Sequence, residues 1–167
     1  MEHTLIALVE DKPGVLNRVA SLFRQRAFNI ESLAVGHTEQ PGISRMTIVV
    51  DSDRTDVQQV TRHLYKLVNV IQVEDVTGKP AVTRDLALIR VQANGGGSRS
   101  EVMQLVDTFR ARVVDVSLDT LMVEVTGTEE KINGLIQVLR PFGVVEMVRT
   151  GRVAMVRGST NTMTMLS

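Results

Sequence analysis

The pattern of apolar residues repeats once along the chain of 167 residues, and this repeat limits the possible fold more than any other feature. Residues 4–10 form an aliphatic run typical of a strand, and residues 15–26 carry their apolar side chains at helical spacing. Two apolar runs joined by a Pro-Gly turn then predict a hairpin, and residues 57–76 predict a second helix and a closing strand. The same order of elements returns between residues 85 and 148.

The repeat predicts an α+β protein made of two tandem ferredoxin-like domains, each with the order β-α-β-β-α-β. Their predicted boundaries are residues 1–78 and 84–158, and residues 159–167 are expected to form a mobile tail. Each half has about 75 residues, which gives only marginal stability from burial alone. Two helices cover one face of each sheet, so the other face and the edge strands need a partner. The sequence therefore predicts an oligomer.

The composition argues against several classes of protein. Aromatic residues make up only 3% of the chain, so the core must be aliphatic, and the absence of cysteine excludes disulfides and thiolate metal sites. The formal net charge is zero, so no basic excess points to nucleic acid or to an anionic membrane surface. No apolar stretch approaches the roughly 20 residues of a membrane span, and the first residues lack a signal-peptide pattern. These features predict a cytoplasmic protein.

The residues offer little for catalysis. The three histidines are scattered, and no nucleophile stands beside a base in the sequence. Gly95-Gly96-Gly97 could cradle a phosphate, but it lacks a phosphate-binding lysine, so a flexible loop is the better interpretation. RNA recognition motifs share the β-α-β-β-α-β order, but they need stacking aromatic residues that the central strands lack here. An acylphosphatase-like hydrolase needs an arginine in the first loop, where this chain has Lys12 and Pro13.

The loop after the first predicted strand, in the stretch EDKPGVLNRV, allows two interpretations that can both hold. In the first, Asp11 caps the following helix and Gly14 permits a tight turn. In the second, amides exposed at the start of the helix bind a carboxylate, and Gly14 lets the ligand approach the backbone. A side-chain oxygen of Asp11 or Asn29 would then receive an ammonium group, with Val15 and Leu16 beside the ligand's aliphatic side chain. The second interpretation describes a site for a free amino acid.

Several stretches resemble the small, regulatory subunit of acetohydroxyacid synthase (acetolactate synthase), whose N-terminal part is an ACT domain. The specific motifs are NIESL at residues 29–33 and SRMT at residues 44–47. LFRQR at residues 22–26 and TGRVAMVRG at residues 150–158 extend the resemblance to both halves. The resemblance therefore implies an N-terminal ACT domain followed by an ACT-like ferredoxin domain.

The resemblance also implies regulation without catalysis, so the chain itself is not expected to be an enzyme. The expected partner is the large catalytic subunit. The small subunit is expected to activate it and to confer feedback inhibition, usually by valine. No cofactor is expected in this subunit, whereas thiamine diphosphate, magnesium and FAD are expected on the catalytic partner. The family function lies in the biosynthesis of the branched-chain amino acids. An alternative is a stand-alone amino-acid-sensing ACT protein that acts on another partner.

In the family, the effector lies between two ACT domains paired side by side in a homodimer. One chain contributes the loop after its first strand, and the other contributes the start of its second strand. The resemblance also places Gly36 where relatives have small residues, so a larger side chain is expected to crowd the interface. Carried over to this sequence, the effector-binding positions are Asp11, Gly14, Val15, Leu16, Asn29 and Ile30.

Overall fold

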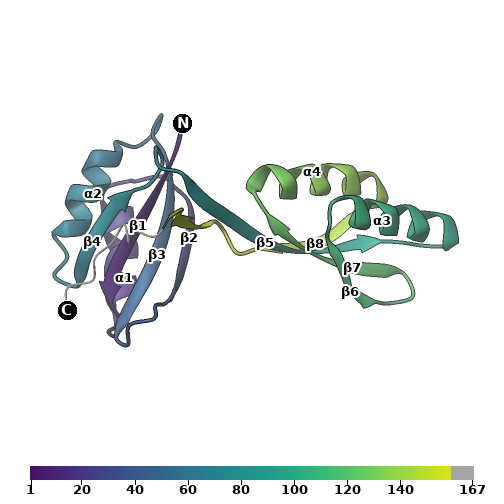
Figure 1. The fold of residues 1–167 in the computed structure, drawn as a ribbon, viewed down its shortest axis with the longest axis horizontal. Helices are drawn as coiled ribbons and strands as arrows, with labels where there is room; N and C mark the ends of the chain where they lie inside the picture. The colour runs from purple at the N-terminus through teal and green to yellow at the C-terminus, as the bar shows by residue number, and fades with distance from the viewer. Residues whose placement is uncertain (159–167) are drawn as a thin grey trace. The chain divides into compact units, whose positions relative to one another are not determined.

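A computed structural model describes residues 1–158, and the predicted mobile tail at residues 159–167 lies outside the described residues. The chain divides into two compact units (Figure 1). The first contains Met1–Val82 together with residues 152–158, and the second contains Thr83–Gly151. None of the described helices is long and apolar enough to cross a membrane.

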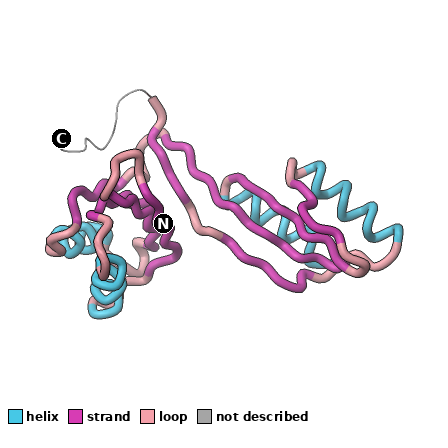
Figure 2. Tube along the Cα trace, turned by 90° about the horizontal axis from the view of Figure 1, so that it is seen from below, coloured by secondary structure: helices cyan, strands magenta, loops and turns pink. Residues whose placement is uncertain are grey.

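The first unit has the predicted order of elements. They are β1 (Glu2–Glu10), α1 (Val15–Gln25), β2 (Ile30–His37), β3 (Ile43–Asp51), α2 (Val57–Tyr65) and β4 (Val70–Asp75). The four strands form an antiparallel sheet in the order β2-β3-β1-β4, and β2 therefore lies at an edge. The two helices lie on one side of the strands, as Figure 2 shows with helices in cyan and strands in magenta.

The second unit repeats this arrangement. Its elements are β5 (Ala81–Gln92), α3 (Gly96–Thr108), β6 (Arg112–Val116), β7 (Thr120–Gly127), α4 (Glu129–Leu139), the short 3-10 helix η1 (Arg140–Phe142) and β8 (Val144–Arg149). The strand order is β6-β7-β5-β8, so the central and edge positions match those of the first unit. The predicted flexible glycine run is partly helical, because α3 begins at Gly96 with Gly95 as its N-cap. The predicted β-α-β-β-α-β order is thus confirmed in both units.

The core of the first unit shows why β1 is its central strand. Alternate residues Leu5, Ala7 and Val9 face the helices and pack against Val19 and Phe23 of α1. Because side chains alternate across a strand, the intervening residues must face the other side of the sheet. Those residues are also apolar and buried, so β1 needs cover on both faces.

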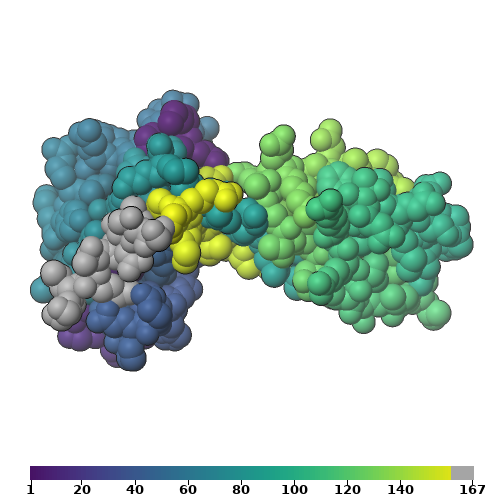
Figure 3. All heavy atoms as spheres, in the orientation of Figure 1, coloured from purple at the N-terminus to yellow at the C-terminus, as the bar shows by residue number. Residues whose placement is uncertain are grey.

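A short strand that the sequence did not predict supplies part of this cover. We expected the last strand to end near residue 148, but β9 (Val153–Val156) follows and belongs to the first unit. Its Ala154 packs with Ile6, Leu8 and Val76 in a separate buried cluster. The open face of the first sheet is therefore partly covered by the chain's own C-terminal strand, whose yellow atoms lie against the first unit in Figure 3.

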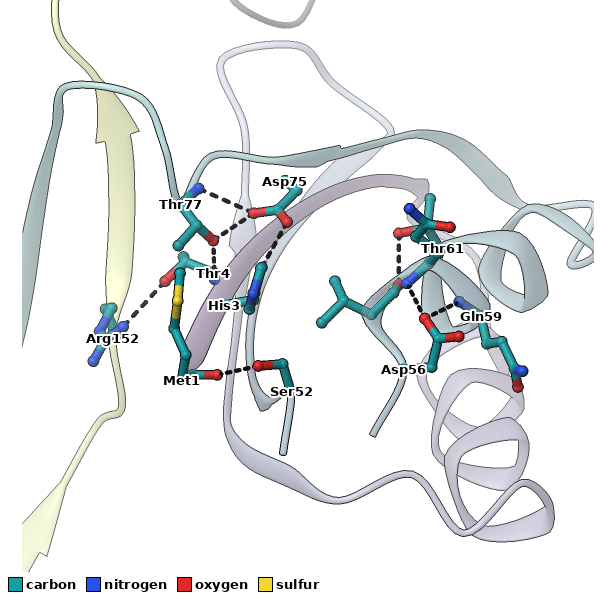
Figure 4. Close-up of polar contacts among 12 residues, drawn as sticks. Met1, His3, Thr4, Ser52, Asp56, Gln59, Thr61, Asp75, Thr77 and Arg152 are labelled. Carbon is teal, nitrogen blue, oxygen red and sulfur yellow. Dashed lines mark hydrogen bonds and ion pairs between the residues drawn. The ribbon is translucent and has the colours of Figure 1, made fainter. Parts of the chain in front are cut away.

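Two arginines hold β9 and the residue before it in place. Arg45, from the SRMT motif on β3, donates through Nη2 to the carbonyl oxygen of Ala154 at 2.7 Å. Arg152 lies 2.7 Å from the Glu2 carboxylate and donates to Thr4 Oγ1 at 3.1 Å (Figure 4). The two compact units divide between Val82 and Thr83, and the structure groups residues 152–156 with the first unit.

Candidate functional site

Two backbone hydrogen bonds fix the start of the loop between β1 and α1. The Glu10 amide donates to the Asn69 carbonyl at 2.8 Å, and the Asp11 amide donates to the Gly42 carbonyl at 2.8 Å. The Asn69 side chain also accepts a hydrogen bond from Arg18 of α1 at 2.6 Å. Asn69 is buried, and its two hydrogen bonds join the base of the loop to the helix that follows. The loop is therefore presented in one conformation by elements on both sides.

Gly14 is the N-cap of α1 and has a φ of +85°, a left-handed conformation that favours glycine. No side chain caps this helix, so the expectation that Asp11 caps it is wrong. Asp11 lies three residues before the N-cap, and its carboxylate lies 3.1 Å from Nδ1 of His37 instead. The first intrahelical bond runs from the Arg18 amide to the Gly14 carbonyl at 3.0 Å. The Val15 amide donates to the Lys12 carbonyl at 3.3 Å. The next amides of the first turn have no intrahelical acceptor and can bind an anion.

The next two predicted residues differ in their accessibility. Val15 is only 5% exposed and packs into the core of the first unit. Leu16 is 49% exposed and is available to a ligand or a second chain. The side chain of Val15 therefore stabilises the core, and its backbone amide lies at the start of α1. Val35 on β2 is a further apolar residue of this unit with nearly half its surface exposed, at 47%.

Asn29 and Ile30 lie at the start of the edge strand β2. The Asn29 amide donates to Thr55 Oγ1 at 2.9 Å, and its side-chain Nδ2 donates to Glu31 Oε1 at 2.9 Å. Ile30 is half-buried and packs against the core cluster of the first unit. The backbone of Asn29 is therefore held from the loop between β3 and α2.

Within one chain, the two halves of the predicted site lie at opposite ends of the sheet. Ile30 pairs with Val50, which pairs with His3 at the start of β1. The loop begins after Glu10, at the other end of the same strand. Seven residues of strand correspond to about 23 Å. The structure thus brings Asp11, Gly14 and Leu16 together but does not bring them to Asn29.

The histidines make separate contacts. His3 Nδ1 lies 2.8 Å from the Asp75 carboxylate, which also accepts hydrogen bonds from Thr77 (Figure 4). Burial raises the pKa of Asp75, but hydrogen bonds from Thr77 and His3 outweigh it and lower the pKa below its usual range. His63 packs against Phe28, and burial lowers the pKa of its imidazole. Among residues 1–158, no three His, Asp or Glu side chains gather to hold a metal ion.

Three residues around the loop and the start of β2 were missed by the sequence reasoning. They are His37, Thr55 and Asn69. Each contacts its partner across 26 to 59 residues of sequence, because the sheet register brings them together. No local motif marks such contacts, so only a correct prediction of strand register could have found them.

Comparison with known proteins agrees with this geometry. Residues 5–72 match the family described as AHAS small subunit-like ACT domain, and residues 84–158 match the family described as small subunit of acetolactate synthase. The fold and the exposed loop thus define a protein of the ACT-domain class with two ferredoxin-like units.

Full-length relatives give the particular family. The chain is 53% identical over 159 residues to the probable acetolactate synthase small subunit of Archaeoglobus fulgidus, with 95% of this chain and 99% of that protein covered. It is 56% identical over 156 residues to the acetolactate synthase small subunit of Mycobacterium leprae, with 93% and 92% covered. The crystal structure of the acetolactate synthase small subunit from Thermotoga maritima superposes with a TM-score of 0.86 at 39% identity, with 96% and 99% covered. The chain belongs to the acetolactate synthase small subunit family.

Proposed function

We propose that the chain is the regulatory, non-catalytic subunit of an acetohydroxyacid synthase. It binds the large thiamine-dependent subunit, activates it, and makes it sensitive to feedback inhibition by a branched-chain amino acid, with valine as the leading candidate. The relatives' names support the assembly with a synthase, and the uncapped helix start supports a site for an anionic group. The proposal places all cofactors of the reaction on the catalytic partner.

One observation carries the proposed effector site: its two halves lie about 23 Å apart in one chain, at opposite ends of a sheet with β2 at its edge. Among residues 1–158, no strand pairs with the outer side of β2. If two copies pair antiparallel through β2, the start of this strand in one copy approaches the loop end of the other. Such a twofold arrangement assembles two complete sites from two incomplete ones.

The proposed site recognises each part of a free amino acid separately. Backbone amides at the start of α1, those of Gly14 and Leu16, receive the carboxylate. The Asn29 side-chain oxygen of the second copy, and the Asp11 carboxylate when it is released from His37, receive the ammonium group. Leu16 and Ile30 supply apolar surface for a branched side chain. Two copies would be held in a different relative orientation when the ligand bridges them, and the catalytic partner would respond to that orientation.

Gly14→Asp tests this proposal in the complex with the catalytic subunit. The new carboxylate lies where the effector's carboxylate is proposed to bind, and like-charge juxtaposition costs several kcal/mol, so the concentration of valine for half-inhibition should rise more than about tenfold. A Cβ at Gly14 meets no atom within 4 Å, but the φ of +85° strains any side chain at this position, so the control must carry the same strain. Acetolactate formation is measured across a valine titration.

Gly95→Asp is the matched control, because Gly95 is the N-cap of α3 in the second unit, also has a positive φ and is also free of neighbours. This variant should keep the valine response. Equal valine sensitivity of the Gly14→Asp complex and the wild-type complex would contradict the proposed site. If acetolactate formation by the catalytic subunit does not change when this chain is added, the proposed function is contradicted.

A further inference from the structure

The start of β2 departs from regular strand pairing at the position where the proposed effector contact lies. Ile30 pairs with Val50, but Ser32 pairs with Val49. The chain therefore advances two residues on β2 while it advances one residue on β3. Glu31 is the extra residue of this bulge. Because a bulge leaves part of the strand outside the regular hydrogen-bond ladder, other contacts must fix the backbone there.

Thr55 provides such a contact for the backbone of Asn29. Its Oγ1 accepts a hydrogen bond from the Asn29 amide at 2.9 Å. Thr55 is only 6% exposed, and its own amide donates to the Asp51 carbonyl at 3.0 Å, so the hydroxyl is held firmly at the end of β3. A buried hydroxyl from a distant loop therefore sets where β2 begins.

Glu31 provides the second contact, to the side chain of Asn29. Asn29 Nδ2 donates to Glu31 Oε1 at 2.9 Å. An amide group has one donor end and one acceptor end, so this bond leaves the oxygen as the end of Asn29 available to a ligand. An ammonium group needs an acceptor. Glu31 thus holds the amide in the orientation that suits the ammonium group of an amino acid.

We infer that Thr55 and Glu31 are positioning residues of the effector site: Thr55 holds the Asn29 backbone and Glu31 turns the Asn29 amide oxygen toward the effector's ammonium group. This inference rests on the proposed function, because it concerns the same amino-acid site. Thr55 is buried and acts only through Asn29. Glu31 is exposed on the edge strand and acts through the orientation of the amide.

The test compares Thr55→Val with Thr55→Ser in the purified full-length chain, with L-valine binding measured by calorimetry. Valine keeps the shape of threonine but removes the hydroxyl acceptor, and serine keeps the acceptor. A buried amide N–H left without an acceptor costs about 1–3 kcal/mol of stability, so the Asn29 backbone should shift in Thr55→Val. This shift should weaken L-valine binding about five- to tenfold. Thr55→Ser should bind L-valine within about twofold of wild type. Circular dichroism confirms that each variant is folded before the titration.

Glu31→Ala provides an independent arm, because an exposed residue can be truncated without harm to the core. It should weaken L-valine binding about twofold, since the amide then turns freely between two orientations and only one of them suits the ammonium group.

If the wild-type chain binds L-valine, the proposed site stands. Unchanged L-valine binding in both Thr55→Val and Glu31→Ala then overturns the inference alone. Equal weakening in Thr55→Val and Thr55→Ser also overturns it, because the hydroxyl would then not matter. Failure of the wild-type chain to bind L-valine, L-leucine or L-isoleucine removes the proposed effector site itself, and the inference falls with it.

Discussion

Arg45→Met tests the role of the SRMT motif, which the sequence marked only as a family signature. In the structure, Arg45 reaches across the open face of the first sheet and donates to the Ala154 carbonyl at 2.7 Å. Methionine keeps an unbranched apolar stem of similar reach but has no donor. The substitution therefore removes the hydrogen bond to β9 and leaves most of the packing in place.

The expected size of the effect follows from two opposing contributions. A hydrogen bond from a charged donor contributes about 1.5–3 kcal/mol. Burial lowers the pKa of the Arg45 guanidinium, which shows that the surroundings disfavour its charge and offset part of that contribution. We therefore expect β9 to lose about 1–2 kcal/mol of local stability, near the lower end of the range.

Amide hydrogen exchange followed by mass spectrometry reports local opening of residues 153–157 directly. A loss of 1.4 kcal/mol corresponds to about tenfold faster exchange in this segment, with little change in β1 and β3. Arg90→Met in the second unit is the matched control, because Arg90 makes only a longer contact with exposed Glu146, at 3.6 Å. Exchange of residues 153–157 that changes less than about twofold in Arg45→Met would refute the argument that this arginine holds β9.

Two further predictions concern the edge strand and a buried histidine. Gly36→Val on β2 should leave the melting temperature nearly unchanged, because a Cβ at this position meets no atom of its own chain within 4 Å. The substitution should instead weaken self-association in analytical ultracentrifugation. An unaltered dimer would argue against pairing through β2. Burial lowers the pKa of His63 in the folded chain below its ordinary value of about 6.5. The unfolded chain therefore binds the proton more readily, and the free energy of unfolding should fall as the pH drops through about 6.5. Urea unfolding from pH 7.5 to pH 5 should show a shallower pH dependence in His63→Leu, and an identical slope in both proteins would contradict this assignment.

The fold was largely predictable because its signals are local. Alternating or continuous aliphatic runs marked β1 and β3, and helical spacing marked α1 and α2 to within two residues at each end. The strand β9 was missed because it has only four residues and its alternation is short. Its burial depends on Ile6 and Leu8, about 150 residues earlier in the sequence, and local patterns carry no record of such contacts.

The candidate site was predictable only in part for the same reason. The sequence predicted a tight turn at Gly14, and the structure has this residue at φ +85°. Asp11 was wrongly expected to cap α1, because sequence spacing did not show that His37 would lie beside it. The support of Asn29 by Thr55 depends on the bulge in β2, and bulges follow from sheet register rather than from residue type.

The return of β9 to the first unit has a practical consequence for any attempt to divide the protein. A polypeptide cut after Val82 would lack the residues that cover Ile6, Leu8 and Val76, and it would expose a continuous apolar surface. In topological terms the second unit is an insertion within the first. An excised first unit that keeps β9 would join residue 82 to residue 152 through a short linker, which deletes the inserted second unit.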